Sequence, residues 1–418
     1  MSCYKNIKRG VHVGKQAEKV SIWCVVSMAS IPLVMTLGNS MLIPVLPILE
    51  KKVGISSFQS SMIITSYSVA AVFLIPLAGY LSDRIGRKKV ILPSLVLALI
   101  GGLIAGFASW KMADPYTWII IGRILQGIGS AGAMPIILPL VGDLYKDNAE
   151  KTSACLGTIE TSNTFGKVLS PILGSILAAF LWFLPFFAIS AFSLISIALI
   201  FFFVKVPKGK QEKPKKFKEF VSNTKKTLKK EGKWLFTVFL LGFYVFLVLF
   251  SVLFYLSDIL EKVHQIFDIK KGFILAIPLF LLCIVAFTVG RKIKGNLPTM
   301  RKILIVCLIV TSISVVFVGF VSKQLILLLV VTSILGMAIG AVMPVLDAII
   351  TENIKKEERG TITSFYSAAR FAGVAAGPPL MSIVMAKFLN GGYITAGVLG
   401  LIMLFVVMKF IQVKEIEN

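Results

Sequence analysis

The chain has 418 residues, of which 56% are hydrophobic and only 15% are charged. Soluble globular proteins carry about 25% charged residues, so the composition excludes an ordinary soluble enzyme or nucleic-acid-binding protein. The formal net charge is nevertheless +24, from 44 Lys and Arg against 20 Asp and Glu. Such an excess either marks one side of a membrane or forms one binding surface.

Twelve segments are long and apolar enough to cross a membrane as helices, since a span needs about 20 mostly apolar residues. They are continuous apolar runs, whereas the strands of a membrane barrel alternate. The first run is too long for a signal peptide, and no cleavage site follows it. We therefore predict an all-α integral membrane protein with twelve transmembrane helices, at residues 21–47, 59–81, 90–110, 116–142, 153–180, 182–204, 235–257, 272–290, 302–321, 325–349, 361–387 and 393–412.

The positive charges favour one orientation of these spans. The tails and the loops after spans 2, 4, 6, 8 and 10 hold 33 of the 44 Lys and Arg, whereas the opposite loops hold 8. Positive loops face the cytoplasm, so both termini are expected there. The predicted organisation is a tail (1–20), a six-helix bundle (21–204), a basic linker (205–234), a second six-helix bundle (235–412) and a second tail (413–418).

The linker contains twelve lysines between Lys205 and Lys233. It is either a solvated orientation signal or an amphipathic helix on the inner membrane surface. In the second case, anionic lipid would attract it by about 1 kcal/mol per basic residue.

The two halves of the chain repeat each other. Gly132-Ala-Met-Pro135 in span 4 matches Gly340-Ala-Val-Met-Pro344 in span 10, at an offset of 209 residues between the prolines. The Gly166…Pro171 segment of span 5 matches Gly373…Pro378 of span 11, at an offset of 207. Parallel six-helix repeats are typical of transporters whose halves rock about a central site.

The loop between spans 2 and 3 reads Gly79-Tyr-Leu-Ser-Asp83-Arg84-Ile-Gly86-Arg87-Lys88-Lys89. It resembles the loop signature of the major facilitator superfamily, Gly-x-x-x-Asp-Arg-x-Gly-Arg-Lys-Lys, at every defined position. The resemblance implies a conformational latch in which Asp83 docks on the start of span 11, near Gly360. The latch residues would be Gly79, Asp83, Arg84, Gly86, Arg87 and Lys88.

Two further motifs narrow the resemblance to twelve-span bacterial drug:proton antiporters of the plasma membrane. Arg123-Ile-Leu-Gln-Gly-Ile-Gly-Ser-Ala resembles the family's span-4 motif. Span 5 resembles its antiporter motif, although serine replaces two of the glycines. The antiporter-type residues are Gly166, Ser170, Pro171 and Gly174, with Gly373, Gly377 and Pro378 as their counterparts in span 11.

Five ionisable residues lie inside the predicted spans, and such residues are by default functional candidates. We predict that Arg123, Glu160, Lys167, Asp347 and Arg370 take part in proton coupling, with Glu160 as the protonated group and Arg123 and Lys167 adjusting it. Glu160 and Lys167 are seven residues apart on one helix face, roughly 10 Å, too far for direct contact. The alternatives are a structural salt bridge at Glu160, an Asp347–Arg370 pair, or an anionic substrate bound by Arg370.

Polar, methionine and aromatic side chains are candidates for the substrate cavity, because such side chains adapt to lipophilic compounds. They are Asn39, Met35, Tyr67, Tyr244 and Phe365; each is otherwise packed or lipid-facing. We predict a monomeric secondary transporter that exports lipophilic or amphiphilic drug-like compounds by alternating access, with protons as the coupling ion. An exporter or flippase of an endogenous metabolite or glycolipid is the first alternative, and a membrane enzyme or sensor the distant one.

Neither a cofactor nor a metal is expected. The five cysteines and two histidines show no ligand spacing, and no phosphate-binding Gly-x-x-x-x-Gly-Lys-Ser/Thr loop is present. The lipid bilayer and a small-molecule substrate are the expected partners, and nucleic acid is not one.

Overall fold

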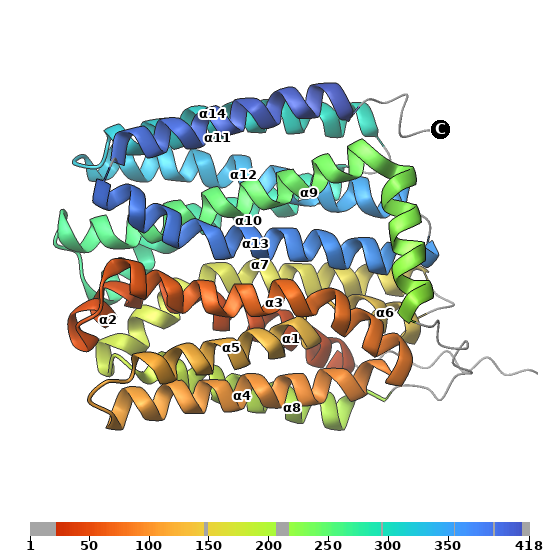
Figure 1. Ribbon diagram of the computed structural model, residues 1–418, viewed down its shortest axis with the longest axis horizontal. Helices are drawn as coiled ribbons and strands as arrows, with labels where there is room; N and C mark the ends of the chain where they lie inside the picture. The colour runs from red at the N-terminus through yellow and green to blue at the C-terminus, as the bar shows by residue number, and fades with distance from the viewer. Residues whose placement is uncertain are drawn as a thin grey trace, which may run out of the picture.

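The computed structural model describes residues 22–145, 149–205, 217–293, 296–354, 356–387 and 389–411. The predicted terminal tails and residues 206–216 of the predicted linker lie outside these ranges. The described chain is helical (Figure 1). Its helices are α1 Ile22–Ser40, η1 Ile43–Val45, α2 Leu46–Val53, α3 Ser57–Ile85, α4 Arg87–Lys111, α5 Tyr116–Ala133, α6 Ile137–Leu144, α7 Ala149–Phe180, α8 Leu184–Phe203, α9 Phe217–Lys262, α10 Asp268–Lys292, α11 Leu297–Phe320, α12 Leu325–Asn353, α13 Lys356–Lys387 and α14 Leu389–Phe410.

Twelve spans, the predicted number, are found among the described residues. Two of them are interrupted rather than continuous. The first comprises α1, η1 and α2, and the fourth comprises α5 and α6. Proline lacks the N–H that continues a helix, and Pro44, Pro47 and Pro135 lie at these interruptions.

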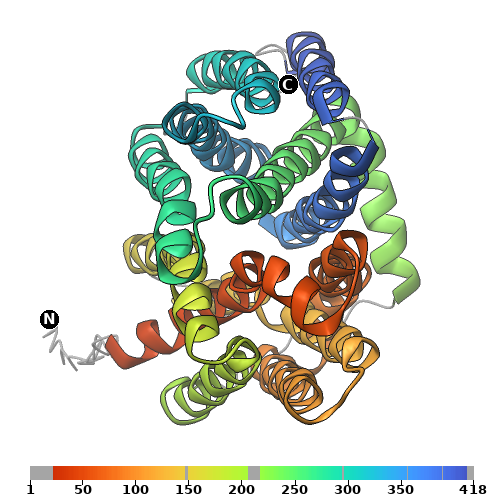
Figure 2. The same ribbon diagram turned by 90° about the vertical axis from the view of Figure 1, so that its left-hand side faces the viewer.

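The helices form two groups that correspond to the two halves of the sequence. Figure 2 shows α1–α8 on one side and α9–α14 on the other. The halves meet where α3 packs against α13 and α7 against α10. The Thr65 hydroxyl donates to the Ala375 carbonyl at 2.7 Å and the Ser257 hydroxyl to the Ile43 carbonyl at 2.9 Å.

The internal repeat is visible in the packing. Helix α7 packs on α1, and α13 packs on α9 in the same relation one half later. A Cβ atom at Gly174 would collide with the Met41 carbonyl oxygen, and one at Gly373 with the Phe243 carbonyl oxygen. These two glycines, although at different positions of the repeat, therefore permit close backbone approach of α7 to the segment after α1 and of α13 to α9.

Helix α9 begins inside the predicted linker and then becomes span 7 (Figure 1). The two parts meet at a kink at Gly232, whose φ of 43° favours glycine. In the linker part Leu228 packs against the core, whereas Lys225 and Lys229 are exposed. This part is amphipathic, as predicted for one of the two alternatives.

We call this end of the bundle the linker end and the opposite one, where α2 lies, the α2 end.

Candidate transport site

Four of the five predicted in-membrane charges lie together between the halves. Glu160 and Lys167 are on α7 of the first half, Asp347 is on α12 and Arg370 on α13 of the second. Arg370 and Asp347 form an ion pair, with 3.6 Å between Nη1 and Oδ1. The charges of Glu160, Asp347 and Arg370 all act on Lys167. A motion of the halves relative to one another would therefore change the interactions of Lys167 with Asp347 and Arg370, but not its separation from Glu160 on the same helix.

The two acids in this cluster are more exposed than the two bases. Glu160 is exposed, and the Asp347 side chain is 37% exposed. Lys167 is only 7% exposed. At 1.5 Å per residue, Glu160 lies roughly 16 Å from the start of α7 at the linker end, and Lys167 roughly 10 Å deeper. The acids are thus the members of the cluster nearer to the linker end.

A small pocket of about 10 Å³ between the halves continues from Lys167 toward the α2 end. Five helices contribute to it, α1, η1 and α7 from the first half and α9 and α10 from the second. Lys167 is its charged member, and most of its other wall is aliphatic. The lining residues are Ser40, Ile43, Lys167, Pro171, Leu249, Phe250, Leu253, Leu275 and Leu279.

Arg123 does not belong to the charge cluster. It is fully buried on α5 within the first half, where its guanidinium donates to the carbonyls of Gly38 on α1 (2.7 Å) and Ile63 on α3 (2.8 Å). It also donates to the Gln126 amide oxygen (2.6 Å) and stacks over the Tyr67 ring. The structure thus gives Arg123 a packing role that joins three helices. It does not place Arg123 beside Glu160, where we expected it.

Three predicted cavity residues are also used in packing. The Tyr67 hydroxyl donates to the Met35 carbonyl at 3.1 Å, and the Tyr244 hydroxyl donates to the Ala396 carbonyl at 3.1 Å. All three side chains are buried. Asn39 is buried and Phe365 half-buried, and neither lines the pocket. The search for aromatic and methionine residues therefore found core positions. Tyrosine hydroxyl groups and the shapes of these side chains suit helix–helix contacts as well as they suit a substrate cavity.

The latch motif forms a compact network at the linker end. Arg87 pairs with Asp83 and with Asp143 at 3.1 Å, and it donates to the Ser82 hydroxyl at 2.7 Å. Lys88 donates to the Val204 carbonyl at the end of α8 at 2.7 Å. The expected docking of Asp83 on the start of α13 is not seen among the described residues, because Arg87 satisfies this carboxylate within the motif. Instead, Gly79 allows α3 to approach Ser364 of α13.

At the α2 end, a buried ionic network closes the gap between the halves. Lys271 donates to the Pro44 carbonyl (2.8 Å) and pairs with Glu261 (3.0 Å), which also pairs with Lys51 (2.7 Å). Glu261 and Lys271 are only 3% and 2% exposed in their side chains. We call Pro44, Lys51, Glu261 and Lys271 the clasp. The sequence prediction missed it, since these charges were assigned to loops outside the spans.

Comparison with known proteins agrees with this architecture. The family model of the Major Facilitator Superfamily matches residues 28–298 and 299–418. The Bacillibactin exporter of Bacillus subtilis (strain 168) is 48% identical over 394 residues, which are 94% of this chain and 98% of that protein. Multidrug resistance protein 2 of the same organism is 26% identical, over 88% of this chain and 92% of its own. The crystal structure of a D-xylose–proton symporter superposes with a TM-score of 0.75 at 15% identity, covering 94% of this chain and 98% of that one.

The fold and the site between its halves define a membrane transporter. The chain belongs to the major facilitator superfamily, as the loop motif indicated. It is a multi-pass membrane protein of the transporter class, and its relatives of similar length are exporters and multidrug resistance proteins.

Proposed function

We propose that this protein exports bacillibactin, or a small molecule closely similar to it, in exchange for protons. The similarity to the Bacillibactin exporter carries the proposal, because it is 48% identical and extends over nearly the whole length of both chains. This similarity supports the endogenous-metabolite alternative over the drug-like substrates that the sequence motifs favoured. The linker end, with most of the lysines, faces the cytoplasm in a bacterial plasma membrane.

The cluster supplies the groups for coupling. The cluster draws its two acids and two bases from both halves: Glu160, Asp347, Lys167 and Arg370. Protonation of one acid therefore changes the electrostatic interactions between the halves. When the linker end closes, Glu160 leaves water, and a buried carboxylate without a close cation is costly. Proton uptake removes this cost. For exchange, Glu160 takes up a proton while the α2 end is open to the outside, stays protonated while both ends are closed, and releases the proton when the linker end opens to the cytoplasm.

The test is export in cells and everted membrane vesicles. Vesicles that contain the wild-type protein should accumulate bacillibactin when a proton gradient is present and lose it on addition of an uncoupler. Glu160→Gln should bind bacillibactin yet no longer respond to the gradient. Asp114→Asn is the matched control, because Asp114 is an exposed acid outside the cluster. Gradient-driven accumulation by Glu160→Gln at the wild-type rate would refute the coupling role.

A second candidate function, efflux of lipophilic compounds, is supported by the similarity to Multidrug resistance protein 2 and by the aliphatic pocket wall. The same vesicles distinguish the two. Accumulation of the dye ethidium, with none of bacillibactin, would favour drug efflux.

A further inference from the structure

Lys167 differs from the other buried cations of the protein in its surroundings. Lys271 has a carboxylate and a carbonyl oxygen as partners, Arg370 has Asp347, and Arg123 has three oxygen acceptors. Among the described residues, no carboxylate lies within ion-pair distance of the Lys167 ammonium group. Its hydrogen-bond contact is the Met343 sulfur at 3.7 Å, and a thioether is a weak acceptor.

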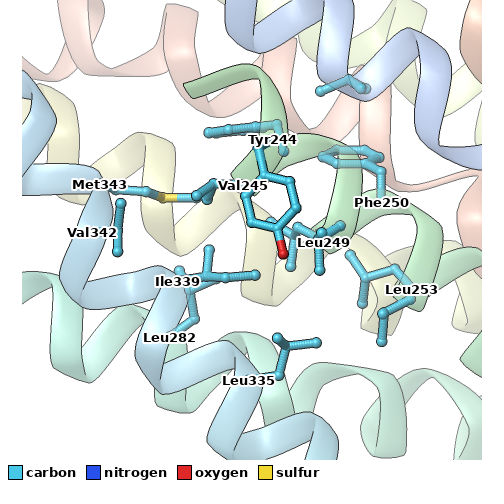
Figure 3. Packing of buried hydrophobic residues seen from close by; sticks show 14 of the residues in the cluster. Tyr244, Val245, Leu249, Phe250, Leu253, Leu282, Leu335, Ile339, Val342 and Met343 are labelled. Atoms are coloured by element: carbon cyan, nitrogen blue, oxygen red, sulfur yellow. The ribbon is translucent and has the colours of Figure 1, made fainter. Parts of the chain in front are cut away.

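The remaining contacts of this ammonium group are also soft. The Phe246 ring centroid lies 5.5 Å away, a distance at which a cation interacts with an aromatic face. Figure 3 shows the neighbouring packing, in which the Met343 side chain of α12 lies beside Val245 of α9 and Leu249, Phe250 and Leu253 lie farther along α9. These three α9 residues also line the pocket to which Lys167 contributes its charge. A cation thus lies at an apolar and aromatic wall without an anion.

The nearby acids do not fill this position. Glu160 is on the same helix, two turns away, so its separation from Lys167 is fixed by the helix and does not change when the halves move. Asp347 is already paired with Arg370. A buried ammonium group needs an anionic or oxygen partner, and in this protein the position opposite Lys167 is the space between the halves.

We propose that Lys167 binds the acidic group of the transported compound, and that the compound's body is apolar or aromatic. This deepens the proposed function and rests on it. The ammonium group pairs with the acid, and the walls formed by Leu249, Phe250 and Leu279 contact the rest of the molecule once the halves have separated enough to admit it. Binding thereby supplies the negative charge that Lys167 lacks. Release of the compound on the other side leaves Lys167 without a carboxylate partner again.

The experiment uses a pair of probes that differ only in charge, 1-naphthoate and its neutral amide. The purified full chain in lipid nanodiscs is heated with each probe. Unfolding is followed with a thiol-reactive dye that reports exposure of helix cysteines such as Cys155 and Cys307. A ligand that binds the folded state raises the unfolding midpoint. We expect 1-naphthoate to raise it and the amide to have no effect at the same concentration.

Three variants assign the effect. Lys167→Met should weaken the apparent affinity for 1-naphthoate at least tenfold, whereas Lys167→Arg, which keeps the charge, should stay within threefold of the wild type. Lys111→Met removes an exposed positive charge at the end of α4, outside the pocket, and should also stay within threefold. Equal stabilisation by acid and amide, absence of stabilisation by the acid, or full binding by Lys167→Met would each overturn the proposal.

The wild-type comparison of acid and amide needs no variant, so it decides the question even if Lys167→Met fails to fold. It also separates the two proposals. Acid-selective stabilisation that depends on Lys167, without bacillibactin transport in vesicles, would reject the proposed substrate and retain the anion site. Bacillibactin transport without acid selectivity would reject the anion site alone.

Discussion

The clasp gives a sharp prediction about which end of the transporter opens. In Glu261→Gln, Lys271 loses its carboxylate in a position that is almost fully buried, while it keeps the Pro44 carbonyl. Removing one partner of a buried ion pair costs about 3–5 kcal/mol, because the other charge is left uncompensated. Opening of the α2 end would expose Lys271 to water and relieve this cost. The open-to-closed ratio should therefore rise by a factor between about 150 and about 4,000.

Lys51→Gln is the matched control for this substitution. Lys51 pairs with the same carboxylate, but its own side chain is 62% exposed. Exposed pairs contribute only about 0.2–1 kcal/mol, so opening should increase less than about fivefold. The double substitution Glu261→Gln, Lys271→Met removes the buried charge as well as its partner. It should return toward the wild-type ratio, because replacing a whole buried pair is often neutral.

The assay is alkylation of a cysteine placed at Ser40, which lines the pocket below the clasp. The native cysteines other than Cys155 are replaced, and a membrane-impermeant maleimide is added to the α2 side. Cys155, buried in α7 within the first half, reports unfolding. We expect faster reaction at position 40 in Glu261→Gln and slow reaction at Cys155. Equal rates in Glu261→Gln and the wild type, or an effect of Lys51→Gln as large as that of Glu261→Gln, would refute the reasoning.

Three further predictions concern single sites. Arg123→Met should destabilise the fold by about 1–3 kcal/mol, followed by thermal melting, because it removes the hydrogen bonds that Arg123 donates to Gly38, Ile63 and Gln126; a variant as stable as the wild type would contradict the packing role. Gly174→Ala should destabilise by about 1–3 kcal/mol through collision with the Met41 carbonyl. Gly157→Ala in the same helix, where a Cβ meets nothing within 4 Å, should stabilise by about 0.5–1 kcal/mol; equal effects at both glycines would contradict this. Asp347→Asn should change the melting midpoint little, since its pair with Arg370 is partly exposed, yet abolish gradient-driven export in the vesicle assay; unchanged export would exclude Asp347 from coupling.

The sequence predicted the number of spans and the family because both depend on local patterns. Hydropathy identifies each apolar run, and the Gly79–Lys89 motif is contiguous. Two span boundaries were predicted less accurately. Span 7 was predicted to end at residue 257, but α9 continues to Lys262; span 8 was predicted to begin at residue 272, but α10 begins at Asp268. Charges such as Glu261 and Lys271 end a hydropathy window, although their mutual pairing allows the structure to bury them.

The site could be predicted only in part for a related reason. The sequence shows that a charged residue within a span needs a compensating partner, but it does not show which group is that partner. Arg123 obtains carbonyl oxygens from Gly38 and Ile63, partners that every residue possesses and no pattern reveals. The facing of aromatic residues such as Tyr67 was equally hidden, because helices that are apolar all round carry no amphipathic signal.

The distribution of paired and unpaired charges also indicates how the two ends alternate. At the α2 end the buried clasp charges have partners across the halves, so this end is closed by interactions that hydration would replace. At the linker end Glu160 is exposed, and no ion pair joins it to the second half within the described residues. Closing that end would take Glu160 out of water, and opening the α2 end would hydrate the clasp. Lys167 lies between the exposed acids of the linker end and the clasp of the α2 end. An acid bound to Lys167 would contact both the charge cluster and the pocket, so its binding would favour the conformation in which both are accessible to it.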